Sequence, residues 1–355
     1  MNGPYRWRNG AAEAGGRRTW RLAILAVVFA VLCGALTACL DTTPATIKFG
    51  LLAPFEGADR ATGYDALAGV RLALREHNQS ASGFRIELVA LDDHHDPSGQ
   101  MAAQRAAEIV ADPGVVAVIG GFGNGPASGA APVLAEAGVP FVVAAATVND
   151  MPLTGAVRLS PGDEAIARFV LDWATVWHAN RWSIVGKGGL ADALRQTLAT
   201  EGMSTVADER EAQVVMYAGN DVVEAASLLG NLPGDGSGPI FVGGPAVDNP
   251  RFAQLAGPRG AGANYISLAR PADEPLAAAF QAATGSPPSS AAKLAYDAAR
   301  FLLDSWDRHS PPTRAALLQA LKQRGAGQTA RDVTPTLYRL DGTGYPGEQL
   351  TSKLR

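Results

Sequence analysis

VVAVIGGFGNGP, residues 115–126, joins an unbroken apolar run to a glycine-rich loop, and a stretch of helical periodicity follows. A continuous apolar run is typical of a parallel strand that is covered on both faces. A glycine-rich loop directly after such a strand lets the chain turn tightly and presents backbone N–H groups at the N-terminus of the next helix. The stretch therefore predicts a strand–loop–helix unit of an α/β fold.

Units of this kind recur along the chain. Short apolar runs alternate with segments in which apolar residues return every three to four positions, which predicts strands alternating with helices. The predicted strands are Ile47–Pro54, Arg85–Asp92, Val115–Gly121, Pro140–Ala146, Trp182–Lys187, Ala212–Gly219, Pro239–Gly243, Tyr265–Ala269 and Thr336–Leu340. Asp96-Pro97 is expected to open a helix with Asp as N-cap and Pro at the first helical position.

The order of these elements predicts two doubly wound α/β lobes. Residues 272–330 are mainly helical in the pattern, and a last strand follows them. Ligands of doubly wound sheets bind beyond the carboxyl ends of the strands. We therefore expect a binding site in the cleft between the two lobes.

The composition excludes several classes of protein. Of the 355 residues, 47% are hydrophobic and 18% are charged, which rules out a disordered chain. The net charge of −4 argues against a nucleic-acid-binding surface. Two cysteines allow at most one disulfide, so a small disulfide-stapled scaffold is excluded as well.

Residues 1–38 have the layout of an export signal. A basic region around Arg17, Arg18 and Arg21 precedes the apolar run Leu22–Ala35, which is shorter than the ~20 residues of a membrane span. Leu36-Thr37-Ala38-Cys39 follows and resembles the lipobox of bacterial lipoproteins. The alternative is an uncleaved N-terminal anchor helix. The adjacent arginines leave the Sec and twin-arginine export routes both open.

Cleavage before Cys39 has consequences for the mature chain. We expect a lipid on Cys39, a tether over residues 39–45, and an extracytoplasmic body that is held at the membrane. The second cysteine, Cys33, leaves with the leader, so no disulfide is expected in the mature protein.

Candidate binding residues follow the strand ends. Asn124 lies in the glycine-rich loop, Thr147 follows the next strand, and Phe55 follows the first strand. Neighbouring parallel strands end at the same edge, so we expect these residues to face one crevice. Asp221 and Asp248 follow strand ends in the second lobe, where each is expected either to meet a ligand amine or to cap a turn.

No cofactor, metal or catalytic residue is expected. Asp92-Asp93-His94-His95-Asp96 has the composition of a metal site, but adjacent loop residues point apart and no second group at helical spacing completes a ligand set. The Gly120–Gly125 loop lacks the spacing of a dinucleotide or P-loop motif. Ser128 is not in a Gly-x-Ser-x-Gly elbow. Since catalytic triads assemble in space, an extracytoplasmic hydrolase is the distant alternative.

The order of motifs resembles the type I periplasmic solute-binding proteins, in their branched-chain amino acid-binding (leucine/isoleucine/valine) branch. The resemblance is carried by Ile47–Pro54, Tyr64–Asn78, Asp92-Asp93 with Asp96-Pro97, Val118-Ile119-Gly120, Gly138-Val139-Pro140 and Ala144–Thr147. It implies three crossovers between the lobes, near Arg158, Ala269 and Asp332. Lobe I would comprise residues 46–158 and 272–331, and lobe II residues 159–271 and 332–355.

The resemblance also implies a function. A small amino-acid-like solute would bind between the lobes and pass to a permease driven by a cytoplasmic ATPase, as in an ABC importer. The family holds the ligand carboxylate at the loop that contains Phe122 and Asn124. It uses the strand end at Ala145 and Thr147 for the α-amino or carboxylate group.

The sequence departs from the family at several contacts. The usual Ser falls at Asn124, the second-lobe Tyr at about Asn220, and the acid that pairs the ligand ammonium at about Pro245. A buried unpaired ammonium costs several kcal/mol. A standard amino acid is therefore expected only if Asp221 or Asp248 substitutes, and an amide, a carboxylate or a larger apolar acid is expected otherwise.

The departures leave a second function open. A ligand-sensing lipoprotein, or one with a degenerate pocket, would act on the same fold through a partner protein.

Overall fold

The computed structural model describes residues 45–80, 84–148, 151, 154–234, 237–306, 311–323, 334–342 and 344–350. These residues fall in one compact unit that begins at Ala45. The expected signal peptide and Cys39 lie outside the described residues. Within the described part of the chain, no helix has the length and apolar character needed to span a membrane.

The first sheet is parallel throughout. It contains β1 (Ala45–Ala53), β2 (Phe84–Asp92), β3 (Val115–Gly120), β4 (Phe141–Val143) and β5 (Ala156–Arg158), in the spatial order β2-β1-β3-β4-β5. Every residue of β3 and β4 is buried, as the unbroken apolar runs predict.

The second sheet is parallel over most of its width. It contains β6 (Arg181–Val185), β7 (Ser204–Thr205), β8 (Val214–Tyr217), β9 (Ile240–Gly243), β10 (Asn264–Ser267), β11 (Thr336–Arg339) and β12 (Glu348–Leu350). The spatial order is β12-β11-β10-β9-β8-β6-β7. Among these described strands, β11 runs antiparallel to its two neighbours, β10 and β12, and the other neighbouring pairs are parallel.

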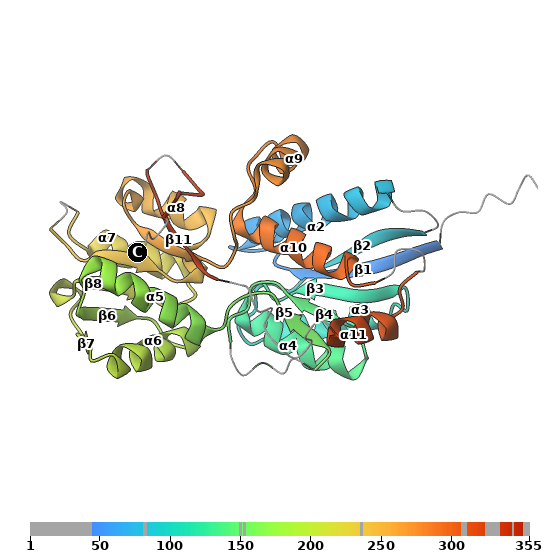
Figure 1. Cartoon of the computed structure of the whole chain (residues 1–355), viewed down its shortest axis with the longest axis horizontal. Helices are drawn as coiled ribbons and strands as arrows, with labels where there is room; N and C mark the ends of the chain where they lie inside the picture. The colour runs from blue at the N-terminus through green and yellow to red at the C-terminus, as the bar shows by residue number, and fades with distance from the viewer. Residues whose placement is uncertain are drawn as a thin grey trace, which may run out of the picture. The chain divides into compact units, whose positions relative to one another are not determined.

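Helices cover both sheets, as Figure 1 shows. On the first sheet, α2 (Arg60–Ser80) and α10 (Ser290–Leu303) lie on one face, and α3 (Gln100–Val110) and α4 (Asn124–Glu136) lie on the other. Helix α9 (Glu274–Thr284) packs on α2, and α11 (Arg314–Gln323) packs on β3.

The second sheet carries its own helices. Helix α5 (Asp163–Trp177) packs on α6 (Gly189–Thr200), and α7 (Val222–Asn231) packs on α8 (Pro250–Ala256). Three short 3₁₀ turns complete the described elements: η1 (Glu209–Glu211), η2 (Pro245–Val247) and η3 (Gly257–Gly260). The expectation of two Rossmann-like α/β lobes is confirmed.

The chain passes between the two sheets at three places. It goes from β5 to α5, from β10 to α9, and from α11 to β11. The first two lie at the predicted places, after Arg158 and after Ala269. The predicted crossover at Asp332 lies outside the described residues.

One helix boundary differs from the prediction. Helix α3 begins at Gln100, with Gly99 as N-cap at φ 74°, and not at Asp96-Pro97. Asp96 instead closes a turn, since its carboxylate accepts hydrogen bonds from the Ser98 N–H at 2.9 Å and the Ser98 hydroxyl at 2.7 Å. The same carboxylate accepts the Met101 N–H at 3.2 Å, so it caps the helix from the preceding turn.

Candidate functional site

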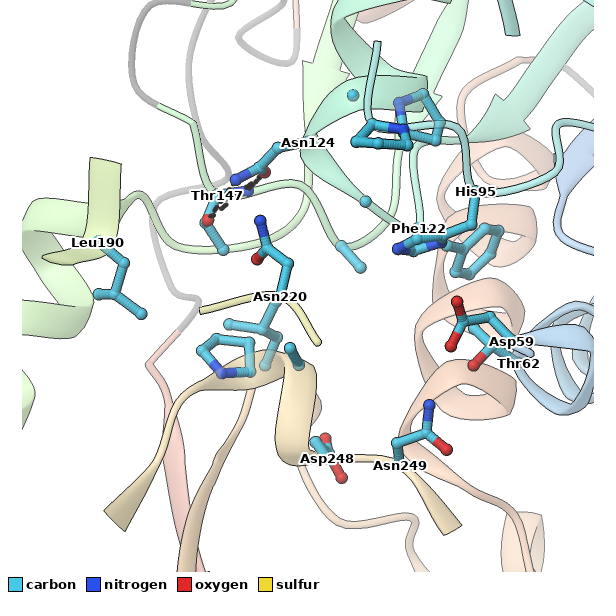
Figure 2. Close-up of a pocket in the computed structure, with 18 of the residues that line it drawn as sticks. Asp59, Thr62, His95, Phe122, Asn124, Thr147, Leu190, Asn220, Asp248 and Asn249 are labelled. Atoms are coloured by element: carbon cyan, nitrogen blue, oxygen red, sulfur yellow. Dashed lines mark hydrogen bonds between the residues drawn. The ribbon is translucent and has the colours of Figure 1, made fainter. Parts of the chain in front are cut away.

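A cavity of about 390 Å³ lies where the strand ends of the two sheets meet, and Figure 2 shows its lining. The first sheet contributes the loops after β3 and β4, and the second sheet the loops after β6, β8 and β9. All of these loops follow the carboxyl ends of parallel strands, where doubly wound folds bind ligands.

Asn124 and Thr147 are joined directly. The Asn124 Oδ1 atom accepts the backbone N–H of Thr147 at 2.7 Å and that of Val148 at 3.2 Å. The Asn124 Nδ2 atom donates to Thr147 Oγ1 at 3.3 Å. The side chain of Asn124 therefore fixes the loop after β4 to the start of α4 and already occupies two backbone donors of that loop.

The N-terminus of α4 opens into the cavity. Its N-cap is Gly123, and no side chain caps the helix. The first backbone N–H groups of a helix have no intrahelical acceptor, and the positive end of the helix dipole favours an anion there. A carboxylate is therefore the group best suited to this corner.

Polar contacts link the Thr147 loop to the first crossover. The carbonyl of Thr147 accepts the Asp163 N–H at 2.9 Å. Arg158 donates to the Val148 carbonyl, and the Ser160 hydroxyl donates to the Ala146 carbonyl. Burial raises the pKa of the Asp163 carboxyl, and the Thr147 hydroxyl and the Arg158 charge oppose that rise. The loop that contains Thr147 is thus hydrogen-bonded to the segment of residues 158–163, which joins the two sheets.

Asp248 supplies a carboxylate on the second wall. Tyr345 Oη donates to Asp248 Oδ1 at 2.6 Å. Burial raises the pKa of Asp248, while hydrogen bonds with Ser290, Tyr345 and Ser267 lower it. Asp248 lines the cavity near Pro245, which is the position where the family's usual acid is missing.

The structure brings most of the predicted residues to one place. The cavity lining includes Phe122, Asn124, Ala145, Thr147, Asn220, Pro245 and Asp248. Phe55 and Asp221 are not among the residues that line it. Phe55 packs edge-on against Tyr64, with ring centroids 5.7 Å apart. Asp221 is the N-cap of α7, where its Oδ1 accepts the Val223 N–H at 2.7 Å.

Several lining residues were not expected from the sequence. They are Asp59, Thr62, His95, Leu190, Asn249 and Ser290. Ser290 comes from a helix far along the chain, so no local signal marks it. His95 belongs to the Asp/His run, whose carboxylates accept turn N–H groups; Asp93 Oδ1, for example, accepts the His95 N–H at 2.9 Å. Among the described residues no group of three His, Cys, Asp or Glu side chains is arranged to hold a metal ion.

Comparisons with known proteins agree with this geometry. The sequence profile of a family described as periplasmic binding protein matches residues 46–215. The Leu/Ile/Val-binding protein BraC3 of Rhizobium johnstonii is 27% identical over 347 residues, which cover 89% of this chain and 90% of that protein.

Solved structures share the fold. The substrate-binding protein LivJ of Streptococcus pneumoniae, in complex with isoleucine, has a TM-score of 0.72 at 20% identity and covers 86% of this chain and 99% of its own. A solute-binding protein of Rhodopseudomonas palustris, in complex with 3,4-dihydroxybenzoic acid, has a TM-score of 0.69 at 19% identity, with coverages of 86% and 96%.

The two-sheet fold with its cavity at the strand ends, together with the matched profile, defines a type I periplasmic binding protein. Within that class, the profile match over residues 46–215 and the likeness to BraC3 confirm the resemblance to the branched-chain amino acid-binding (leucine/isoleucine/valine) family that the sequence indicates. Proteins of this family are extracytoplasmic solute-binding components of transporters, so the chain is a binding protein and not an enzyme.

Proposed function

We propose that the chain is the lipid-anchored substrate-binding protein of an ABC importer, and that it binds a small amino-acid-like solute in the cavity. The observation that carries this proposal is the convergence of strand-end residues from both sheets on one cavity. A solute held by both walls favours the closed arrangement over the open one, and a permease could recognise that arrangement.

The two walls offer complementary charges to such a solute. The uncapped N-terminus of α4 suits its carboxylate, and Thr147 lies beside that helix end in the lining. Asp248 suits its ammonium group, in place of the acid missing at Pro245. Asp221 is already used to cap α7, which leaves Asp248 as the better of the two predicted acids.

A thermal-shift screen tests the proposal. The full-length protein in detergent is screened against the common amino acids, their amides and small carboxylates. A ligand present at 100 times its Kd is expected to add about 2.7 kcal/mol to the free energy of unfolding. The Asp248→Asn variant is expected to lose affinity for an ammonium-bearing ligand. The absence of any shift across the screen contradicts solute binding.

The anchor and the domain division are part of the same proposal. The lipobox-like Leu36-Thr37-Ala38-Cys39 supports lipidation of Cys39 and tethering to the cell membrane. The packing of α9, α10 and α11 with elements of the first sheet supports a lobe I of residues 46–158 and 272–331. Residues 159–271 and 332–355 form lobe II in this proposal. Mass spectrometry of the mature N-terminus, with Cys39→Ser as control, tests the anchor.

One observation favours the alternative of a ligand sensor with an altered pocket. The Thr147 and Val148 N–H groups are already paired with Asn124 Oδ1, so they are not offered to a ligand. A sensor would bind solute yet support no uptake. Uptake of the solute, measured in cells with and without the gene for this protein, distinguishes the two functions.

A further inference from the structure

The half of the cavity opposite Asn124 and Thr147 is polar. Figure 2 shows Asp59, Thr62 and His95 gathered there, beside the ring of Phe122. Asp59 directly precedes α2, Thr62 lies in the first turn of that helix, and His95 comes from the loop after β2. An aliphatic side chain placed in this half would meet a carboxylate, a hydroxyl and an imidazole.

His95 is held rigidly in this position. Its backbone has φ 51°, a conformation that few residues other than glycine adopt, and the Asp93 carboxylate accepts its N–H at 2.9 Å. Its ring lies on the backbone of Gly123, where an added Cβ would come within 2.7 Å of the His95 Cε1 atom. Because Gly123 has no side chain, the His95 ring can pack against its backbone at the wall of the cavity.

Two of these groups have capacity for a further partner. The His95 Nδ1 atom is buried and has no hydrogen-bond partner among the described residues. Asp59 forms no ion pair within the described part of the chain. The Asp59 carboxylate accepts hydrogen bonds, and an imidazole nitrogen without a partner can accept one as well, so this half of the cavity suits a group that donates them.

Resting on the proposed function, we propose that the solute carries a hydrogen-bond donor, an ammonium, guanidinium or amide group, at the end that faces Asp59 and His95. Phe122 and Leu294 line the cavity as well and would contact the apolar stem of such a solute. A site built to hydrogen-bond a donor rejects the analogue that lacks it, because its own polar groups are then desolvated without a partner. Branched-chain aliphatic amino acids are therefore disfavoured.

Binding of isosteric pairs tests this inference directly. Asparagine is compared with leucine, and lysine with 2-aminoheptanoic acid, by calorimetry on the full-length protein in detergent. The donor-bearing member of at least one pair is expected to bind at least about tenfold more tightly than its aliphatic partner. Two variants with matched controls locate the effect: His95→Leu against His94→Leu, and Asp59→Asn against Asp273→Asn.

The controls are close structural matches. His94 is the neighbouring residue, has a similar φ of 55° and does not line the cavity. Asp273 is the N-cap of α9 and also lies outside the lining. The preference for the donor-bearing ligand is expected to fall at least threefold in His95→Leu or in Asp59→Asn and to stay unchanged in both controls.

Each remaining outcome is decisive. If the aliphatic member of both pairs binds as tightly or more tightly, the inference is overturned while the proposed function stands. If the preference survives in both cavity variants, the donor does not face Asp59 and His95, and the inference is again wrong. If neither these compounds nor the broader screen of amino acids, amides and carboxylates binds, the proposed function fails, and this inference fails with it.

Discussion

At the scale of single residues, the hydrogen bonds between Asn124 and Thr147 join two strand-end loops of the first sheet at the cavity. Asn124 and Thr147 could be assigned to one crevice because parallel strands end at a common edge. Their mutual hydrogen bonds could not be foreseen, since these depend on side-chain rotamers across 23 residues of sequence. His95 and Asp59 could not be predicted in this way, because neither directly follows the end of a strand. His95 lies in a turn, and Asp59 lies just before a helix.

Thr147 is expected to contribute to affinity through its hydroxyl. Thr147→Ala removes that hydroxyl and is expected to weaken binding of the identified solute about tenfold, which corresponds to about 1.4 kcal/mol for one hydrogen bond. Thr147→Ser keeps the hydroxyl and is expected to stay close to the parent affinity. Calorimetric titration measures both. Equal affinity in all three proteins would remove Thr147 from the site.

Asp93 gives the stability of the protein a pH dependence. The residue is fully buried, its Oδ2 atom has no hydrogen-bond partner among the described residues, and burial raises the pKa of its carboxyl. A raised pKa in the folded state means that the charged form is penalised. The penalty is absent below the ordinary pKa of an aspartate and grows as the pH rises through the folded-state value.

The Asp93→Asn substitution removes this penalty. It is expected to raise the free energy of unfolding at pH 7 by on the order of 1 kcal/mol, with a gain that vanishes as the pH falls toward 4. Asp208→Asn, at an exposed 3₁₀ N-cap, is the control. Denaturant melts at several pH values measure the effect. A gain that does not change with pH would show that burial of the charge is not its cause.

At the scale of elements, long periodic segments were predicted well and short ones were not. Helices such as α2 and α10 have a repeating apolar face, which fixes their existence even where their ends shift. Strands β5, β7 and β12 are short, with bounds Ala156–Arg158, Ser204–Thr205 and Glu348–Leu350. Ser204 and Thr205 are also exposed, so β7 has no apolar pattern to detect and forms only because β6 offers it an edge.

The contact between α2 and α10 depends on a glycine. A Cβ at Gly69 would lie 2.1 Å from the carbonyl oxygen of Ala292, so Gly69→Ala forces the two helices apart. The substitution is expected to destabilise the fold by about 1–3 kcal/mol. Gly230→Ala in α7 is the matched control, since a Cβ there meets nothing within 4 Å. It is expected to be neutral or slightly stabilising. Similar losses from both substitutions in thermal melts would contradict the packing argument.

At the scale of the whole molecule, the two-sheet organisation followed from counting strands and helices along the chain. The cavity could be placed between the sheets for the same reason. The sequence did not predict how the cavity is linked to the first crossover between the sheets. The loop that contains Thr147 is hydrogen-bonded to the crossover segment that contains Ser160 and Asp163. That link arises from folding in three dimensions and has no signature in the local pattern.

Because residues of both sheets line the cavity, a bound solute is expected to protect both walls at once. Hydrogen–deuterium exchange with saturating solute is expected to slow at residues 122–126 and at residues 188–191 together. Residues 204–205, which form the edge strand β7, serve as an internal control and are expected to exchange unchanged. Protection limited to one wall would show that the solute binds one lobe only.

Tyr345 has a consequence for how the protein can be observed. Its hydroxyl donates a hydrogen bond to Asp248, and its ring stacks on Tyr265 with centroids 6.1 Å apart. The near-ultraviolet absorption of a phenol depends on the strength of the hydrogen bond that its hydroxyl donates. A cation that binds the Asp248 carboxylate weakens the hydrogen bond that Tyr345 donates to it, and this shifts the near-ultraviolet absorption band of Tyr345. The protein therefore carries its own chromophore at the acidic corner of the cavity, and difference absorbance can follow solute capture without any added dye.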